Sequence, residues 1–345
     1  MKIILYAMGG DHAPEAPVMG ALEAAKCYDT EITLVGQGAA ILEVLKKHGI
    51  ETLPEGIEIA HADDVVDMHD DPGKVIHKRK NSSMIIGLRM LAEGQGDAFV
   101  SAGSTGALLS GATLIVKRVR GIRRAAMAPS MPTKAGHKVV ICDCGANAEC
   151  TAEFLLQFGL VASAYAKKVH GMENPRVGLL NIGTEDSKGG QLQKDAYALL
   201  KQAGEQGLIN FVGNVEARGV PMGDVDVVVC DGFNGNVLIK SIEATAMFMG
   251  SLMKKMFKKN IFSKIGYLLC KSGMNDLLKM MDYREIGGTQ FLGIKKPVIK
   301  AHGSSDARAF RNAVKQAMEA AENDISAQLE QELVRLKAVE ENGND

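Results

Sequence analysis

The sequence predicts an α/β fold, a mostly parallel sheet with helices on both of its faces. Three observations favour this class. Apolar runs of strand length alternate with segments whose apolar residues recur every three or four positions. Strand-to-helix junctions carry glycine with small polar residues, and the chain of 345 residues is 46% hydrophobic, which suffices for a large core. We therefore expect residues 1–345 to form a single α/β unit.

The N-terminal part alternates strands and helices joined by short turns. The segment 2–7 is nearly all apolar, as a strand buried on both faces should be, and a helix follows from about Pro14. Strands at 31–36 and 57–60 flank an amphipathic segment that we predict to be a helix. This βαβαβ order predicts parallel pairing.

The middle of the chain begins with an acidic segment at 63–72, which we predict to be a solvated loop, and a helix over 75–93. The apolar strand 98–100 then enters a glycine-rich turn in which Ser104 is placed to cap the next helix. The same pattern continues to the C-terminus. Further strands are predicted at 138–143, 176–182, 225–230 and 297–301 and near Phe211, with helices at 151–168, through Leu192 and Leu199, after 236, and over 305–340.

Six of the strand-to-helix junctions combine glycine with Ser, Thr, Asn, Asp or His. In a parallel sheet they lie at the carboxyl ends of the strands, where open α/β sheets bind ligands if the strand order reverses. A turn does not need so many small polar residues, whereas a pocket for an anion and a carbonyl compound does. Six independent, well-formed turns are the alternative. The junctions are residues 8–12, 103–106, 143–147, 181–190, 231–236 and 302–305.

Common nucleotide-binding and catalytic motifs do not explain these junctions. The nearest match to a dinucleotide fingerprint, Gly36-Gln-Gly-Ala-Ala-Ile41, lacks the third glycine. The P-loop motif, the G-x-S-x-G elbow and H-E-x-x-H are absent, and no Cys/His pair suggests a covalent acyl-enzyme. What remains is a site that binds an anion and polarises a substrate, with direct attack inside a ternary complex.

The overall charge and the cysteines narrow the class of protein further. The formal net charge is −1, so no global field recruits nucleic acid. Without a leader-like segment or an uncharged apolar run of about 18 residues, we expect a cytosolic protein. The six cysteines lack the spacing of a disulfide framework or zinc ribbon, so we expect reduced thiols, no metal and no catalytic cysteine.

Seven motifs resemble those of the bacterial phosphate acyltransferases in order and spacing, and the resemblance covers essentially the whole chain. They are Met8-Gly-Gly-Asp11, Ser101-Ala-Gly-Ser-Thr-Gly-Ala107, Asp143-Cys-Gly-Ala-Asn147, Asn181-Ile-Gly-Thr-Glu185 with Ser187-Lys-Gly189, Gly232-Phe-Asn-Gly-Asn236, Gly287-Gly288 with Leu292-Gly293, and His302-Gly-Ser-Ser305. Two positions depart from the family pattern. Ser104 stands where Asn is frequent, and Thr289-Gln290-Phe291 replaces the more usual Ala-Pro-Leu.

The resemblance implies a Rossmann-like α/β fold related to the phosphotransacetylases, working as a homodimer without a metal or organic cofactor. It implies that inorganic phosphate attacks the thioester of acyl-[acyl carrier protein] and yields acyl-phosphate for membrane phospholipid synthesis. Phosphate is already ionised at neutral pH, and a thiol of pKa about 8.5 leaves without a strong acid, so the protein mainly positions and stabilises. A phosphotransacetylase-like acyl-CoA:phosphate transferase is the alternative.

For this reaction the resemblance gives the junction residues expected roles. Lys188, the only lysine inside a glycine-rich junction, would neutralise phosphate or the oxyanion, with a solvated loop lysine as the alternative. Asn234 and Asn236 would donate to the carbonyl or hold a left-handed turn. Asp143 would orient a donor or accept a proton, or tie loops together. His302 would assist proton transfer or cap the last helix.

The expected binding residues come from the same junctions. For some of them, capping a helix or tying loops together is again the alternative. The expected phosphate-binding residues are Gly103, Ser104, Thr105, Gly106 and Ser304, and the expected substrate-pocket residues are Asp11, Asn147 and Asn181.

A basic amphipathic segment, predicted as a helical hairpin over 247–283, lies between the last two junctions. Residues 251–281 hold seven lysines and one acid, a local charge of +6 that leaves −7 on the rest, and Gly266 and Gly273 mark the expected breaks. Such a segment is typical of peripheral contact with an anionic membrane, here the inner face of the cell membrane, or with an acidic carrier protein. A helix pair buried in a dimer interface is the alternative. The expected contact residues are Lys254, Lys255, Phe257, Lys258 and Ile261.

Two other classes of protein were compared with this interpretation. A dehydrogenase of the isocitrate-like group would need a nucleotide fingerprint, or a metal-binding acidic set near an arginine, and neither is evident. A non-catalytic, lipid-regulated scaffold would use the hairpin but would leave the six glycine-rich junctions unexplained.

Overall fold

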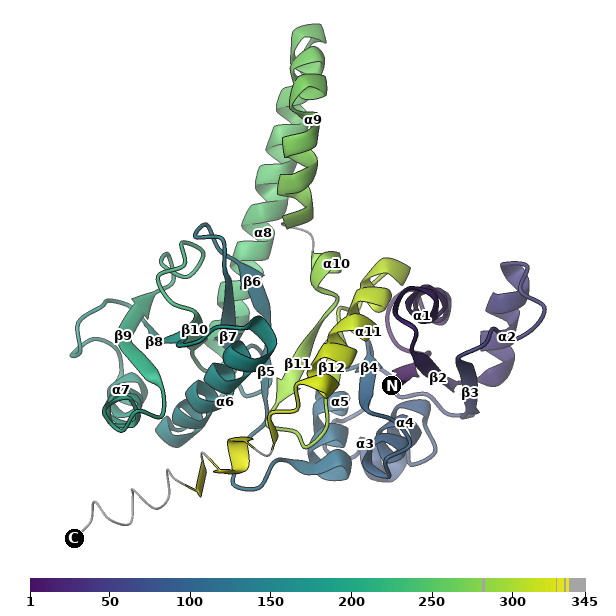
Figure 1. The fold of residues 1–345 in the computed structure, drawn as a ribbon, viewed down its shortest axis with the longest axis horizontal. Coiled ribbons are helices and arrows are strands. Elements are labelled where there is room, and N and C mark those ends of the chain that lie inside the picture. Colours follow the sequence, from purple (N-terminus) through teal and green to yellow (C-terminus); the bar gives the residue numbers. More distant parts are fainter. Residues whose placement is uncertain (281–282, 327, 332, 335–345) are drawn as a thin grey trace.

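The computed structural model describes residues 1–280, 283–326, 328–331, 333 and 334, which build two sheets flanked by helices (Figure 1). The seven strands of the first sheet are β1 (Lys2–Tyr6), β2 (Glu31–Gly36), β3 (Ile57–His61), β4 (Ala98–Ser101), β5 (Ala126–Ala128), β11 (Gly288–Leu292) and β12 (Val298–Ala301). Their order is β3-β2-β1-β4-β12-β11-β5. The first five run parallel, whereas β11 pairs antiparallel with β12 and β5.

The second sheet has the order β6-β7-β10-β8-β9, with β6 antiparallel to β7 and the other pairs parallel. Its strands are β6 (Ser130–Pro132), β7 (Lys138–Cys142), β8 (Arg176–Asn181), β9 (Asn210–Glu216) and β10 (Val227–Val229). Because β5 and β6 are consecutive, the chain crosses from one sheet to the other within a few residues. This crossing brings the carboxyl end of β7 close to the first sheet, where the backbone N–H of Cys144 donates to the carbonyl of Met127 in β5.

Helices cover both faces of each sheet. They are α1 (Glu15–Tyr28), α2 (Gly38–Lys47), α3 (Val75–Lys78), α4 (Ser83–Ala92), α5 (Thr105–Gly111), the π-helix η1 (Ala112–Lys117), α6 (Ala152–His170), α7 (Gln191–Glu205), α8 (Gly232–Phe257), α9 (Ile261–Met280), α10 (Tyr283–Ile286) and α11 (Ala307–Glu322). Alternate residues of β1 divide between two cores: Ile3 and Leu5 face α1 and α11, and Ile4 and Tyr6 face α4 and α5. On the second sheet, α6 and α7 cover one face and the start of α8 covers the other.

The predicted α/β class with mostly parallel strands is confirmed, although the strands divide between two sheets. The helix predicted over 75–93 is instead two, α3 and α4. Residues 79–82 leave helical geometry, and Arg79 there pairs with Asp64 and Asp70 of the acidic loop. That loop is therefore partly neutralised and ordered by an ion pair.

The C-terminal helix predicted over 305–340 is interrupted near its middle, and the described residues 326, 328–331, 333 and 334 are helical again. α11 ends at Glu322, and the next residue, Asn323, donates both its backbone N–H and its side-chain N–H to the carbonyl of Glu319. Asparagine competes in this way with the continuing helix. Residues 335–340 of the predicted helix lie outside the described part of the chain.

α8 and α9 form a hairpin that projects from the body of the molecule (Figure 1). α8 begins at Gly232, inside the second sheet's core, so the hairpin is the extension of a core helix rather than a separate insertion from residue 247. The helices separate at 258–260, and the breaks predicted at Gly266 and Gly273 are wrong because both glycines lie inside α9. The predicted end at 283 follows residues 281–282, which lie outside the described residues.

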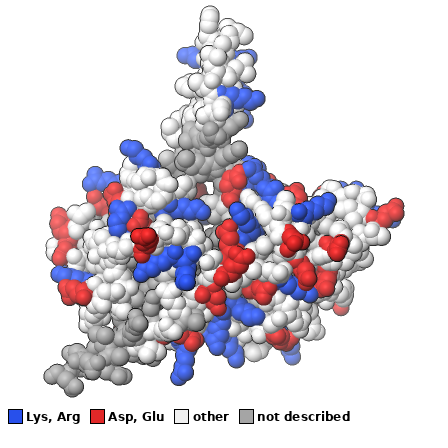
Figure 2. All heavy atoms as spheres, viewed as in Figure 1, with Lys and Arg blue, Asp and Glu red and all other residues white. Residues whose placement is uncertain are grey.

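The hairpin exposes large apolar side chains between its lysines, and Figure 2 shows this projection as a white and blue surface. Phe262 is 78% exposed and Leu269 is 83% exposed. Single exposed apolar residues are normal, but a continuous apolar surface marks an interaction site. No helix in the described ranges is long and apolar enough to cross a membrane. The other exposed members are Met247, Phe248, Met249, Leu252, Met256, Ile261, Ile265 and Leu268.

The predicted contact residues of the hairpin do not all lie on its surface. Lys254, Lys255, Lys258 and Ile261 are exposed. Phe257 is only partly exposed, and its ring packs edge-on against Tyr267 of α9 with the ring centroids 5.3 Å apart. Phe257 therefore joins the two helices, since its ring lies between them, and Phe262 takes its place on the exposed surface.

Candidate active site

The strand order of the first sheet reverses at β1, because β2 lies on one side of it and β4 on the other. Ligands of open α/β sheets bind at such a reversal. The loops after β1 and β4 meet there: a Cβ on Gly9 would lie 2.7 Å from the backbone nitrogen of Gly103, so only glycine permits the approach. The predicted residues Asp11 and 103–106 lie at this reversal, which is called the crevice below after its place in open α/β sheets.

The loop after β12 joins the same crevice. The backbone N–H of Asp11 donates to the carbonyl of Gly303 at 2.8 Å, which links the loops after β1 and β12 across β4. Nδ1 of His302 accepts from the backbone N–H of Ser304 at 3.3 Å and lies 2.8 Å from its hydroxyl oxygen. Burial lowers the pKa of His302 below its ordinary value, and the charge of Lys240 adds to this effect. A neutral imidazole at pH 7 is suited to relay a proton.

Ser104 lies at the N-cap position of α5, but its side chain makes no capping hydrogen bond. The residue is 8% exposed, and the preceding turn is held instead by Ser101, whose hydroxyl accepts from the backbone N–H of Gly103 at 3.1 Å. α5 continues directly as the π-helix η1, a geometry that is frequent at functional sites. The expectation that Ser104 caps the helix is therefore wrong.

The first turn of α8 separates the two predicted asparagines. The carboxylate of Asp231 caps the helix and accepts both the backbone N–H of Asn234, at 2.8 Å, and its side-chain N–H, at 2.6 Å. Asn236 is exposed and lies beside Gly145, where a Cβ would be 3.8 Å from the Asn236 amide oxygen. Asn234 thus supports the cap, and Asn236 is the better placed to donate to a ligand.

Asp143 is fully buried, and its carboxylate is surrounded by donors from the chain itself. It accepts backbone N–H groups from Met127, Cys144 and Asn147 at 2.6–2.8 Å, and the side-chain N–H of Asn147 at 3.0 Å. Burial raises the pKa of Asp143, and these hydrogen bonds offset only part of that effect. The contacts match the loop-tying alternative, so we assign Asp143 and Asn147 a positioning role.

Lys240 and Glu243 of α8 lie near loops of both sheets. They lie one turn apart on α8 and form an ion pair at 2.7 Å. Their charges act on His302, after β12 of the first sheet, and on Cys144, after β7 of the second. α8 therefore lies between the carboxyl-edge loops of both sheets.

Lys188 lies in the loop after β8, on the same edge of the second sheet. Its side chain is 46% exposed and pairs loosely with Glu185 at 3.8 Å. The side-chain amide of Asn181 donates to the carbonyl of Lys188 and to Asn214, both at 3.1 Å, so Asn181 holds the loop. Because β8 and β10 are neighbours, Lys188 and Asn236 follow adjacent strands.

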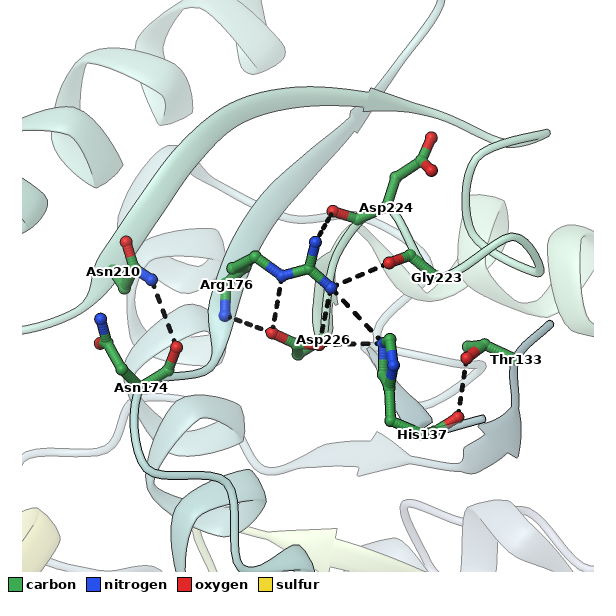
Figure 3. Close-up of polar contacts among 8 residues, drawn as sticks. All are labelled: Thr133, His137, Asn174, Arg176, Asn210, Gly223, Asp224 and Asp226. Carbon is green, nitrogen blue, oxygen red and sulfur yellow. Dashed lines mark hydrogen bonds and ion pairs between the residues drawn. The ribbon is translucent and has the colours of Figure 1, made fainter. Parts of the chain in front are cut away.

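The opposite edge of the second sheet carries a polar cluster with structural contacts (Figure 3). Arg176 binds both carboxylate oxygens of Asp226 at 3.0 Å and donates to the carbonyls of Gly223 and Asp224 at 2.8 Å. His137 lies 3.0 Å from the same carboxylate. Burial acts to raise the pKa of Asp226, but Arg176 outweighs it and holds the pKa below its usual range. Arg176 is the first residue of β8, and Asp226 and His137 directly precede β10 and β7, so the cluster holds the beginnings of these strands together.

The four cysteines that lie near the site, Cys142, Cys144, Cys150 and Cys230, show no sign of reactivity. Burial raises the pKa of Cys142 and Cys230 well above the ordinary value, and that of Cys144 and Cys150 to about 12. A nucleophilic cysteine needs the opposite shift. Within the described ranges, no group of three or more His, Cys, Asp or Glu side chains is arranged to hold a metal ion.

Sequence reasoning missed three charged residues of this region, namely Lys240, Glu243 and Lys300. Opposite charges three residues apart occur on many exposed helix faces, so Lys240 and Glu243 carried no special signal. The sequence did contain a signal for Lys300. It is a lysine inside the apolar strand Val298-Ile-Lys-Ala301, directly before a glycine-rich junction.

The structure is that of an α/β protein whose glycine-rich loops lie at the carboxyl edges of two sheets. A solved phosphotransacetylase from Streptococcus pyogenes has the same fold, with a TM-score of 0.59 and 20% identity over 93% of this chain and 94% of that one. The family model for fatty acid synthesis protein matches residues 1–328. Phosphate acyltransferases from Alkaliphilus oremlandii and from Caldanaerobacter subterraneus subsp. tengcongensis are 47% and 44% identical, covering 94% and 96% of this chain and 95% and 97% of theirs. The chain belongs to this family of phosphate acyltransferases.

Proposed function

We propose that this protein transfers a fatty acyl group from acyl-[acyl carrier protein] to inorganic phosphate, giving acyl-phosphate for membrane phospholipid synthesis. Family membership supports acyl transfer to phosphate. The observation that carries the proposal is the meeting of the loops after β1, β4 and β12 with α8. This arrangement offers one crevice for an anion and adjacent donors for a thioester.

The reaction needs positioning more than activation. A phosphate oxygen attacks the thioester carbonyl carbon, a C–O bond forms, the C–S bond breaks, and the phosphate proton passes to the leaving thiolate. His302 is the group that we expect to relay this proton, because its imidazole lies at the crevice and burial keeps it neutral. Asn236 and Lys188 would stabilise the oxyanion, a contribution of about 3–4 kcal/mol for one well-placed donor.

The phosphate would lie against the turn after β4 and the loop after β12. Gly103, Thr105 and Gly106 offer backbone N–H groups, and the hydroxyl of Ser104 is not used for capping. Ser304 would add a donor from the opposite loop. Asp11 would orient these loops through its bond to Gly303.

The hairpin supports the remaining parts of the proposal. Its lysines and exposed apolar side chains suit peripheral contact with the inner face of the cell membrane or with the acidic carrier protein. The proposal includes a homodimer, as the resemblance implies, and a cytoplasmic location, as expected from the sequence.

The test follows thiol release by the purified protein from an acyl-carrier-protein thioester, with and without phosphate. Phosphate-dependent release supports the proposal. Equal or faster release from acyl-CoA would favour the phosphotransacetylase-like alternative. If neither thioester reacts and NAD is reduced with a hydroxy acid, the protein is a dehydrogenase, and if nothing reacts, the scaffold interpretation gains.

A further inference from the structure

Lys300 is a charged residue in the middle of the first sheet. It pairs with Ser101 of β4 on one side and with Thr289 of β11 on the other. Its strand neighbours Ile299 and Ala301 are fully buried, whereas Lys300 keeps part of its surface accessible. Lysine is rarely placed in a central strand, because burying an ammonium group without a partner costs free energy.

The ammonium group lies where two predicted loops begin. Nζ donates to the carbonyl of Ala102 at 3.2 Å and to the carbonyl of Ala301 at 2.5 Å. Ala102 precedes the turn at Gly103 and Ser104, and Ala301 precedes His302. A lysine ammonium has three N–H donors, so two of them fix the starts of these loops and one is left over.

The charge of this ammonium is poorly compensated. Asp11 is the charged group that acts on the ammonium, and His302 responds to the charge of Lys300. Burial lowers the pKa of Lys300 to about 8, and the charge of Asp11 opposes this effect. An anion in the crevice would restore the balance, since it favours the charged form.

We propose that Lys300 is the cation that binds the phosphate substrate in the crevice between the loops after β1, β4 and β12. The assignment rests on the proposed acyl transfer to phosphate and divides the site into two halves. Lys300 holds the nucleophile on the first sheet, and Lys188 and Asn236 of the second sheet face the thioester. Phosphate therefore binds best while Lys300 is protonated.

The first test compares the variant Lys300→Met with Lys296→Met. Lys296 is the matched control, because its Nζ also donates to a backbone carbonyl, that of Gly96 at 3.2 Å, but near the amino end of the same strand. We expect the KM for phosphate to rise at least tenfold in Lys300→Met, with a much smaller change in the KM for the acyl donor. An unchanged KM for phosphate, or an equal rise in both values, would overturn the assignment.

The second test uses wild-type protein and does not depend on the variant folding. Phosphate-induced stabilisation against heat is measured from pH 7.5 to pH 9.5, where phosphate is mainly dianionic. We expect the stabilisation to weaken as the pH rises through about 8, because Lys300 loses its proton there. Stabilisation that stays constant over this range contradicts the assignment. If phosphate stabilises the protein in this way but no thiol is released, the anion site stands and the proposed acyl transfer fails.

Discussion

Lys188 is the residue that we expect to act on the thioester. Its side chain is 46% exposed and its nearest carboxylate is 3.8 Å away, so removing it disturbs little of the fold. The variant Lys188→Ala should lower kcat about 10²–10³-fold, as the loss of one oxyanion donor does, with an unchanged urea midpoint. Lys194→Ala, an exposed lysine of α7, is the control. A Lys188→Ala enzyme with the wild-type rate at saturating phosphate would remove this residue from the mechanism.

His170, at the end of α6, makes the stability of the protein depend on pH. Its Nε2 lies 2.7 Å from the hydroxyl of Ser130, and burial lowers its pKa from 6.5 to about 4. A histidine with a lowered folded-state pKa contributes stability that is complete above pH 6.5 and is lost as the pH falls toward 4. We expect a loss of about 2–3 kcal/mol in unfolding free energy between pH 7 and pH 4.5 from this residue.

Urea unfolding at both pH values checks this prediction. The variant His170→Gln should show a smaller decrease between pH 7 and pH 4.5 than the wild type, by about that amount. His61→Gln is the control, because the His61 side chain is 59% exposed. Parallel pH profiles for His170→Gln and the wild type would show that His170 is not the group responsible.

At the scale of the elements, the two edges of the second sheet have different expected roles, one in the candidate site and the other in stability. The carboxyl edge carries the predicted site, whereas the amino edge is clamped by Arg176 and Asp226. Removing one partner of a fully buried ion pair costs about 3–5 kcal/mol, and partial exposure reduces this. Arg176→Ala should therefore destabilise the protein by about 2–3 kcal/mol in urea and leave kcat unchanged at low temperature. Arg218→Ala, whose side chain is 84% exposed, should cost less than about 0.5 kcal/mol. A large fall in kcat for Arg176→Ala would contradict this division.

Local patterns explain which elements could be predicted from sequence. Buried strands such as β2 and β8 are apolar runs that end at glycine-rich junctions. Such runs can be recognised directly from the sequence. The split into two sheets could not be predicted from the sequence, because it depends on the three-residue strands β5 and β6, which are consecutive but join different sheets. β5 pairs with the distant β11, whereas β6 pairs with the next strand, β7. The break between α3 and α4 depends on the contacts of Arg79 with the acidic loop, which also follow from the tertiary fold.

The loops of the candidate site could be chosen from the sequence, but the roles of their residues could not be separated there. The junctions were predicted because small polar residues that directly follow an apolar strand form a local sequence pattern. Whether a polar side chain faces a ligand or its own loop is a tertiary property. Asp143 and Asn181 prove to hold loops together, whereas Asn236 lies beside Gly145, and no pattern of residue types separates these cases.

At the scale of the whole molecule, charge is unevenly distributed along the chain. Residues 251–281 have a net charge of +6, and the rest of the chain has a net charge of −7. Each lysine near an anionic membrane contributes about 1 kcal/mol, so the hairpin should bind and the acidic body should be repelled, which orients the protein with the hairpin toward the lipid. The exposed residues Phe262 and Leu269 would then enter the interface.

We expect the double variant Phe262→Asp/Leu269→Asp to lose sedimentation with anionic vesicles. About 0.5 M salt should weaken the sedimentation of the wild-type protein. Met68→Asp, an exposed apolar residue of the body, is the control. If the double variant still sediments but loses activity with the acyl carrier protein and keeps it with acyl-CoA, the hairpin binds the carrier protein instead.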